Sequence, residues 1–417
     1  MAENMILETG TYVFAVLFIF LTFVFSTAIL SIFKKDHYKP FEPFVSIVVP
    51  CYNGESTISR CLDSVFSLDY PKKKIEVIVV NDGSTDNTRT ILGKYMKKHS
   101  NLSVIKGNHE GKSLSLNLGV KNAAYDIIMS VDADTFIEKD SLKRLVRPFQ
   151  MKDVGATNGS CIPYNSDTII SIFQKIEYHY NNLIRKSFSV IFNNGIWFFG
   201  AFACYRKSVL EEIGYFKTNT LTEDMNAAME IYTSGYRTIN VHDAIGMTVV
   251  PHSLSLFYNQ RMRWWIGALQ TLNKNHALFS KRASPSIIFL FINQYWWSLY
   301  ALMSFPLIAY QVYYWLPNSG TLDVALYLFR WFTLTGPIYV LYKIPVWGIN
   351  IYNIFGVASG IMSIFLIIWA IHIFNDRVGL KNAFAIFFYF PYTLILNSII
   401  VISLVKMLFL EKKYFIA

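Results

Sequence analysis

Residues 75–86 read IEVIVVNDGSTD, an apolar and mostly β-branched run that passes directly into polar turn residues. Such a run predicts a buried strand, and the Asn, Asp and Gly that follow predict a tight turn. A similar run occupies residues 45–50, and residues 56–68 between the two carry apolar side chains at helical spacing. The order strand, helix, strand predicts a parallel α/β sheet.

Polar side chains are expected at one edge of this sheet. Two more helical patterns follow, at residues 88–98 and 113–124, and a third apolar strand ends just before Asp132. Ligands of open α/β sheets bind beyond the carboxyl ends of the strands. The segments that begin at Tyr52, Asn81 and Asp132 should therefore meet at one crevice.

The composition indicates a membrane protein that carries a soluble domain. Of 417 residues, 53% are hydrophobic and only 16% are charged, which is too apolar for a soluble globular protein. The formal net charge is +10, but no basic run has interleaved stacking aromatics, so no nucleic-acid partner is expected. The four cysteines lack CxxC spacing and are expected to be reduced packing residues rather than zinc ligands.

Membrane helices are predicted at both ends of the chain. Residues 11–33 are nearly continuous apolar residues, and about 20 such residues span a bilayer. The later candidate spans are residues 286–316, 322–342, 349–374 and 383–410. Residues 322–342 contain Arg330 and Pro337, and an arginine within a membrane is costly, so an interfacial or re-entrant segment is the alternative there.

The predicted organisation has four parts. They are a transmembrane helix (1–33), an α/β domain (34–254), an interfacial helix (255–284) and a bundle of three to four spans (285–417). Lys34 and Lys35 directly follow the first helix, so the positive-inside rule places the α/β domain in the cytoplasm, beneath the plasma membrane, and the amino terminus outside.

The other flanking residues extend this topology. Residues 317–320 and 375–377 are expected in outer loops. The basic inner flanks are expected at Lys281, Arg282, Lys343, Lys412 and Lys413.

Carboxylates follow the third strand and occur again further along the chain. Asp132 and Asp134 alternate on an extended backbone, so both can face one Mg²⁺ or Mn²⁺ ion bound to a nucleotide. The segment Thr222-Glu223-Asp224 has a simpler alternative reading. It could be only a helix start, with Thr222 as N-cap and acids near the positive end of the helix.

Residues 256–272 form an amphipathic helical pattern. Gln260, Arg263 and Trp264 stand at i, i+3 and i+4, which places them on one face. The arginine fork matches diphosphate oxygens. The alternative is a membrane-surface helix with a snorkelling arginine and an interfacial tryptophan.

Taken together, these motifs resemble the inverting family 2 glycosyltransferases, and most closely their membrane-embedded polysaccharide synthases. The resemblance rests on residues 48–53, 81–86, 111–112, 132–134, 222–224 and 260–264. Poly-β-1,6-N-acetylglucosamine synthases are the most similar group, with chitin oligosaccharide, hyaluronan and cellulose synthases further away. The Trp-Gly-Thr-Arg motif of hyaluronan synthases and the gating loop of cellulose synthases are missing, which makes those products less expected.

The resemblance implies a GT-A (Rossmann-like) α/β domain inserted between transmembrane helices, with an α-helical bundle that forms an export channel. It also implies that Asp224 is the general base and that Asp134, with Asp132, holds Mg²⁺ or Mn²⁺. The residues it assigns to substrate binding are Tyr52, Asp82, Lys112, Asp132, Glu223, Gln260, Arg261, Arg263 and Trp264.

Within that set the implied roles differ. Asp82 and Asp132 would hold the uridine and ribose. Lys112, Arg261 and Arg263 would supplement the charge on the diphosphate. Trp264 would stack on the acceptor sugar, and Glu223 would play a supporting part.

The implied reaction moves a sugar, N-acetylglucosamine or a related hexose, from a UDP-sugar to a growing β-linked polysaccharide that is exported. The other expected partners are membrane lipid and, as the resemblance allows, a small accessory membrane subunit. Two alternatives remain open from the sequence. One is a non-processive glycolipid enzyme with a ceramide or polyprenyl-phosphate acceptor; the other is a transporter or receptor with an inactive nucleotide-sugar domain.

Overall fold

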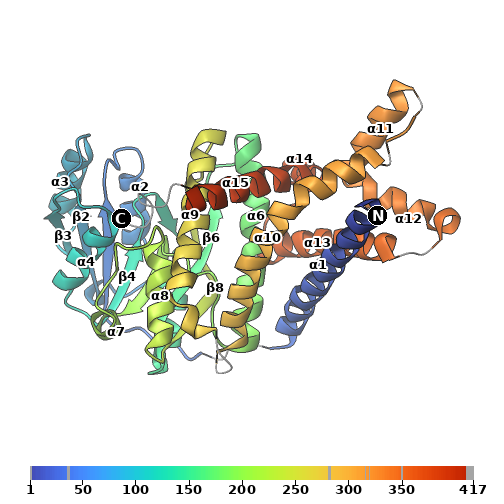
Figure 1. Cartoon of the computed structure of the whole chain (residues 1–417). Coiled ribbons are helices and arrows are strands. Elements are labelled where there is room, and N and C mark those ends of the chain that lie inside the picture. Colours follow the sequence, from blue (N-terminus) through green and yellow to red (C-terminus); the bar gives the residue numbers. More distant parts are fainter. Residues whose placement is uncertain are drawn as a thin grey trace.

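The protein consists of an α/β part and a helical part that lie side by side (Figure 1). The structure, a computed structural model, describes residues 2–34, 38–279, 283–314, 316–318, 320–348 and 351–409. Several residues used for the predicted topology lie outside this range: Lys35, Lys281, Arg282, Ser319, Lys412 and Lys413.

The α/β part contains one eight-stranded sheet with the order β3-β2-β1-β4-β7-β6-β8-β5. The strands are β1 (Val45–Cys51), β2 (Ile75–Asn81), β3 (Leu102–Lys106), β4 (Ile127–Val131), β5 (Thr135–Ile137), β6 (Val154–Pro163), β7 (Phe202–Arg206) and β8 (Arg237–Thr248). The first four strands pair in parallel, as predicted. The prediction of a wholly parallel sheet is wrong beyond them, because β7 is antiparallel to β4 and β6, and β5 is antiparallel to β8.

Helices cover both faces of the sheet. They are α2 (Ile58–Phe66), α3 (Thr88–Lys98), α4 (Lys112–Asn122), α5 (Ser141–Val146), α7 (Lys207–Glu212) and α8 (Glu223–Thr233), with short 3₁₀ turns at Lys72–Lys74, Arg147–Gln150 and His276–Leu278. Along β1 alternate residues enter opposite cores, Ile47 with α2, α3 and α5, and Val48 with α4, α7 and α8. Burial of both faces explains why β1 lacks polar alternation.

Two long helices join the sheet to the helical part. They are α6 (Ile169–Phe192) and α9 (Leu254–Lys274). One side of α6 contacts β6 and β8, and the other packs against α1 and α13. The amphipathic pattern predicted α9, whereas α6 was not predicted.

The helical part contains helices from both ends of the chain. They are α1 (Ala2–Phe33), α10 (Pro285–Tyr314), α11 (Thr321–Trp331), α12 (Thr335–Trp347), α13 (Ile351–Ile373), α14 (Leu380–Phe387) and α15 (Tyr389–Phe409). Among the described residues, three stretches are helical, long and apolar enough to cross a membrane: Glu8–Phe33, Phe355–Ile373 and Tyr389–Phe409. The predicted span at 286–316 is helical up to Tyr314 but is not among them, and it carries the buried polar residues Asn293, Gln294 and Gln311.

The predicted span at residues 322–342 is not one continuous helix. α11 and α12 meet at an angle of 107°, the geometry of a broken span or a re-entrant loop. The Arg330 guanidinium on α11 lies 4.1 Å from the centroid of the Tyr339 ring on α12, so the two arms contact each other. The interfacial or re-entrant alternative therefore fits this segment better than a straight span.

Two residue placements differ from those expected from the predicted topology. Residues 375–377 lie on the side of the sheet, because Asp376 forms a 2.7 Å ion pair with Lys175 on α6 and lies 3.1 Å from the Nε2 atom of His179. Lys343 belongs to α12, which lies at the end of the helical part far from the sheet (Figure 1). Lys175 and His179, on a helix distant in the sequence, hold Asp376 in place, and loop polarity does not reveal these contacts.

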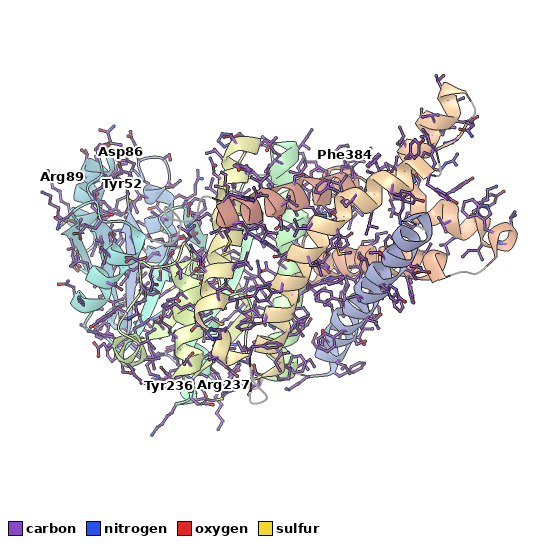
Figure 2. The ribbon with its side chains drawn as sticks, in the orientation of Figure 1. Tyr52, Asp86, Arg89, Tyr236, Arg237 and Phe384 are labelled. Atoms are coloured by element: carbon purple, nitrogen blue, oxygen red, sulfur yellow. The ribbon has the colours of Figure 1, made fainter. Side chains whose placement is uncertain are left out.

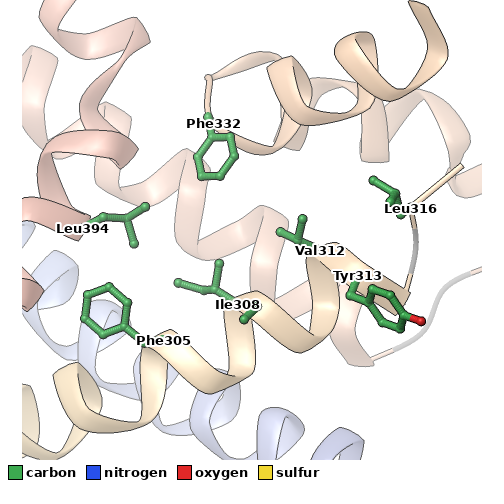
Figure 3. A pocket seen from close by; sticks show the side chains of 8 residues that line it. Phe305, Ile308, Val312, Tyr313, Leu316, Phe332 and Leu394 are labelled. Carbon is green, nitrogen blue, oxygen red and sulfur yellow. The ribbon is translucent and has the colours of Figure 1, made fainter. Parts of the chain in front are cut away.

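An apolar crevice of about 390 Å³ opens between α10, α15 and the break after α11 (Figure 3). Its lining consists of Phe305, Ile308, Ala309, Val312, Tyr313, Leu316, Phe332 and Leu394. Asn293 and Gln311 are buried on another face of the same helix. α10 therefore offers different chemistry on its two sides.

The packing of α4 on β1 leads to a first prediction. A Cβ at Gly119 would lie 2.3 Å from Cγ1 of the buried Val48. Gly119→Ala should lower the free energy of unfolding, because overpacking costs about 1–3 kcal/mol and outweighs the gain in helix propensity. Thermal unfolding in detergent measures this. Gly93→Ala on α3 is the matched control, because its Cβ meets nothing within 4 Å. An unchanged melting temperature for Gly119→Ala would contradict the packing.

Candidate active site

The carboxyl ends of β1, β2 and β4 deliver polar residues to one edge of the sheet. Cys51 of β1 pairs with Asn81 of β2, and β4 runs parallel to β1 on its other side. The residues that follow these strands include Tyr52, Asp82 and Asp132. The predicted convergence of these segments is present in the fold.

Asp82 organises the loop that leads into α4. Its buried carboxylate accepts hydrogen bonds from the N–H groups of Glu110, at 3.2 Å, and Gly111, at 2.8 Å. A Cβ at Gly107 would lie 2.7 Å from the Oδ1 atom of Asp82, so the loop approaches the carboxylate closely. A cavity of about 250 Å³ opens beside Asp82, with Asn108, Ser115 and other residues of the loop and α4 in its wall.

Tyr52 presents an exposed aromatic ring near this edge. Figure 2 shows it at the surface of the α/β part, close to the turn that carries Asp86. The Tyr52 ring is 48% exposed, and its centroid lies 4.3 Å from that of the His109 ring. An exposed ring face of this kind can stack on a planar ligand.

A cation shared by two carboxylates lies at the start of α4. The Nζ atom of Lys112 is 2.7 Å from Oδ1 of Asp132 and 3.1 Å from Oε1 of Glu223. Burial lowers the pKa of Lys112, but the charges of Asp132 and Glu223 outweigh it, so the net shift is upward. Burial likewise raises the pKa of Glu223, while the charge of Lys112 lowers it, with a net downward shift. Lys112 and Glu223 therefore form a charged pair.

Asp134 lies next to this cluster. Burial, and then the charge of Asp132, raises the pKa of Asp134 to about 6. Among the described residues no group of three His, Cys, Asp or Glu could hold a metal ion alone. Asp132 and Asp134 would need further oxygen ligands, and the oxygens of a diphosphate are suitable for Mg²⁺ or Mn²⁺. The two carboxylates thus fit a metal that arrives with its nucleotide.

Asp224 lies in the first turn of α8. Its Oδ2 atom accepts a 2.6 Å hydrogen bond from Gly200 N–H, and Oδ1 accepts a 2.8 Å bond from Met225 N–H. Burial, and then the charge of Glu223, raises the pKa of Asp224 to about 6. A carboxylate with a pKa close to neutrality is suited to general-base chemistry.

The α8 start is anchored to α9. Thr222 occupies the predicted N-cap position, but its side chain forms no capping hydrogen bond. Its hydroxyl lies instead 3.4 Å from that of Thr271 on α9, and Gln270 of α9 accepts a bond from Leu221 N–H. A simple capped helix start therefore does not describe this segment, because its side chain and backbone bond α9 instead.

On α9, Gln260 and Arg263 are available to a ligand. Oε1 of Gln260 is buried without a hydrogen-bond partner in the part of the chain that the structure describes. Arg263 is exposed, and its charge helps to lower the pKa of Glu223, after the larger effects of burial and Lys112. Trp264 is half-buried, and its ring lies 6.2 Å from that of Phe199 at 25°.

Arg261 is placed differently from the prediction. It is buried and forms a 2.9 Å ion pair with Glu177 of α6, which also accepts a hydrogen bond from Tyr392 of α15. Its guanidinium lies 4.4 Å from the centroid of the Trp264 ring. One residue corresponds to about 100° around a helix, so Arg261 leaves the face shared by Gln260 and Arg263. The predicted contact of Arg261 with a diphosphate does not fit this placement.

Sequence reasoning did not identify three residues of this region. Gly200 contacts Asp224, Phe199 contacts Trp264, and Glu177 pairs with Arg261. Each contact joins residues that are far apart in the sequence. The segment before β7 has no periodicity, so no sequence signal could have pointed to it.

Known proteins resemble this chain in sequence and in structure. Residues 46–214 match the family described as glycosyl transferase family 2. A poly-β-1,6-N-acetyl-D-glucosamine synthase of Staphylococcus epidermidis is 32% identical over 253 residues, 60% of each chain. The Staphylococcus aureus (strain COL) synthase is 30% identical over 249 residues, 59% of this chain and 60% of the relative. The chain therefore spans about 60% of the length of these relatives.

One solved structure matches nearly the whole chain. It is a mannosyltransferase from Pyrobaculum calidifontis in complex with GDP-mannose and Mn²⁺. The match covers 99% of this chain and 100% of that one, with 21% identity and a TM-score of 0.68. The similarity shows that the fold is GT-A-like, which confirms the predicted fold class.

The different placements of Arg261 and Arg263 lead to a second prediction. Arg261→Ala should destabilise the protein by about 3–5 kcal/mol, because it leaves the largely buried Glu177 carboxylate without a cationic partner. Arg263→Ala should keep stability within about 0.5 kcal/mol, because the side chain is exposed. It should reduce turnover roughly 10- to 100-fold, the value of a lost charge-assisted hydrogen bond. Thermal unfolding and turnover of both variants measure this, and the reverse pattern would contradict the placement.

Proposed function

We propose that this chain, whose residues 46–214 belong to glycosyl transferase family 2, is a membrane-bound inverting hexosyltransferase that extends a β-linked polysaccharide. The donor would be a UDP-sugar, with N-acetylglucosamine or a related hexose as the sugar. The observation that carries the proposal is the cluster of Lys112, Asp132 and Glu223 next to Asp224. The positive charge of Lys112 can stabilise a leaving group, and the Asp224 carboxylate, with its raised pKa, can take a proton from an acceptor.

Donor binding would use the edge of the sheet. Asp82 and Asp132 would hold the uridine and ribose, and the exposed ring of Tyr52 would stack on the base. Lys112 and Arg263 would neutralise the diphosphate, which stabilises it as a leaving group. Glu223 would keep Lys112 in position through their ion pair.

Asp132 and Asp134 would hold Mg²⁺ or Mn²⁺ together with the donor diphosphate. The ion would supply positive charge to the diphosphate oxygens. The raised pKa of Asp134 supports this assignment, because a buried carboxylate beside another gains from a cation.

Asp224 would act as the general base. It would take the proton of the acceptor hydroxyl as this oxygen attacks the anomeric carbon in line with the departing diphosphate. The C–O bond to the diphosphate breaks as the new glycosidic bond forms, so one displacement inverts the configuration. Gly200 N–H would hold the carboxylate in place through its hydrogen bond.

The acceptor would approach along α9. The half-buried ring of Trp264 would stack on the terminal sugar, and the unpaired Oε1 of Gln260 would accept a hydrogen bond from a sugar hydroxyl. Holding the end of the product next to Asp224 between transfers favours repeated addition.

The membrane placement completes the proposal. The apolar helical stretches would anchor the enzyme in the plasma membrane, with the α/β part in the cytoplasm and the amino terminus outside. The polysaccharide would leave through the helical part, with or without a small accessory subunit.

One observation favours the alternative of single transfer to a lipid acceptor. The crevice bounded by α10, Phe332 and Leu394 is apolar and could take an acyl or isoprenoid chain (Figure 3). The length of the product formed by the purified enzyme distinguishes the two functions, because only a synthase makes a polymer.

A third prediction concerns Asp224. Asp224→Asn should reduce transfer roughly 10²- to 10⁴-fold while UDP affinity stays within a few-fold, because only proton transfer is lost. Wild-type turnover should fall as the pH drops through about 6, where Asp224 becomes protonated. Glu230→Gln, two turns further along α8 and paired with Lys274, is the matched control and should retain transfer. Near-native turnover of Asp224→Asn would rule out its assigned role.

A fourth prediction concerns the metal ion. Turnover should be lost with EDTA and return with Mn²⁺ or Mg²⁺, because the diphosphate charge needs a divalent partner. Asp134→Ala should not respond to either ion, whereas Asp126→Ala, which removes a more exposed carboxylate before β4, should respond like the wild type. Activity measured across a metal titration tests this. Full turnover in EDTA would refute the metal assignment.

A further inference from the structure

The backbone of Gly200 is fixed against the carboxylate of Asp224. Gly200 N–H donates the 2.6 Å hydrogen bond to Oδ2. A Cβ at Gly200 would lie 2.5 Å from Cβ of Asp224, so no larger residue fits without a shift. The position of the backbone at Gly200 therefore determines whether Asp224 keeps this hydrogen bond, which stabilises its charged form.

The neighbouring side chain, Phe199, lies in a stack. The guanidinium of Arg185 is 4.3 Å from the Phe199 ring centroid. The Trp264 ring also stacks with Phe199, with ring centroids 6.2 Å apart and an interplanar angle of 25°. The stack continues with Arg261, whose guanidinium is 4.4 Å from the Trp264 ring. These four residues are referred to below as the cation–aromatic stack.

Arg185, at one end of the stack, is buried and held by hydrogen bonds. It is 1% exposed and bonds neutral partners, Oδ1 of Asn182 at 2.9 Å and the carbonyl of Gly159 at 3.0 Å. No carboxylate pairs with it among the described residues, and burial lowers its pKa to about 10. A buried cation without a carboxylate is unfavourable, and the electron-rich face of an aromatic ring offsets part of that cost. The cation thus favours one orientation of the Phe199 ring.

The other end of the stack belongs to α9. Arg261 is held by its ion pair with Glu177, so Trp264 is supported from α6 as well. Phe199 consequently lies between a side chain that would bind the acceptor and a backbone group that bonds the general base.

We infer that Phe199 is a positioning residue, which couples the Trp264 ring to the Gly200–Asp224 hydrogen bond through the cation–aromatic stack. The inference rests on the proposed roles of Asp224 and Trp264. An acceptor sugar bound to Trp264 would contact the same stack that orients Gly200 N–H. Asp224 would therefore be held in place when an acceptor is bound. Other ionisable groups act on Asp224: Glu223 from α8, Lys112 from α4 and Tyr205 from β7.

The test replaces the ring while keeping an apolar side chain. Phe199→Leu should lower kcat for transfer at least about 10-fold with donor affinity within a few-fold, because only positioning is lost. The acidic limb of its pH–rate profile should move to higher pH, because Asp224 loses a hydrogen bond to its charged form. Phe199→Tyr keeps the stacked ring, so the acidic limb of its pH–rate profile should lie close to that of the wild type.

Phe149→Leu is the matched control. It disrupts another buried phenylalanine, whose ring lies 5.5 Å from the guanidinium of Arg206 in the same domain, and it should leave the limb unchanged. If Phe199→Leu fails to fold, Arg185→Lys provides the test instead. This variant keeps the positive charge but loses the planar group that stacks on Phe199, so it should also move the acidic limb of the pH–rate profile to higher pH.

The outcomes are separable. A wild-type pH–rate profile in Phe199→Leu, or an equal shift in Phe149→Leu, would overturn the inference while leaving the transferase assignment intact. A wild-type protein that transfers no sugar from any nucleotide sugar would overturn the proposed function itself.

Discussion

The ion pairs of Lys112 with Asp132 and Glu223 are the interaction on which the site depends. They join the end of β4, the start of α4 and the start of α8, which lie far apart in the sequence. Without the lysine, the carboxylates of Asp132, Glu223 and Asp224 would lie near one another with no cation between them. With it, the pKa of Glu223 is lowered, while Asp134 and Asp224 keep pKa values of about 6. A single cation thus divides the acidic residues into those that bind charge and those that can exchange a proton.

The helix α6 connects this chemistry to the helical part. It packs on the sheet through β6 and β8, and its other side contacts α1 and α13. Three of its polar residues contact other parts of the chain: Arg185 contacts Phe199, Glu177 pairs with Arg261, and Lys175 pairs with Asp376. α6 therefore connects the helical part both to the segment before β7 and, through Arg261, to the tryptophan of α9.

The sequence predicted what local periodicity determines. Strands such as β2 and helices such as α3 follow from runs and spacings within a few turns, and the parallel order placed Asp82 and Asp132 at one edge. The antiparallel β7 and the helix α6 were not predicted, because their positions depend on packing between distant segments. The same limit explains Arg261, whose role is set by Glu177 on another helix, and Asp376, which pairs with Lys175 rather than facing the outside.

In the proposed function, Lys112 with its carboxylate partners and Asp224 together transfer a sugar with inversion. The most direct measurement offers the purified protein a panel of labelled UDP-sugars and follows both nucleotide release and the anomeric configuration of the product by NMR. We expect at least one UDP-sugar to release UDP and to yield a β-linked product from an α-linked donor. Retention of the donor configuration, or no nucleotide release with any sugar of the panel, would contradict it.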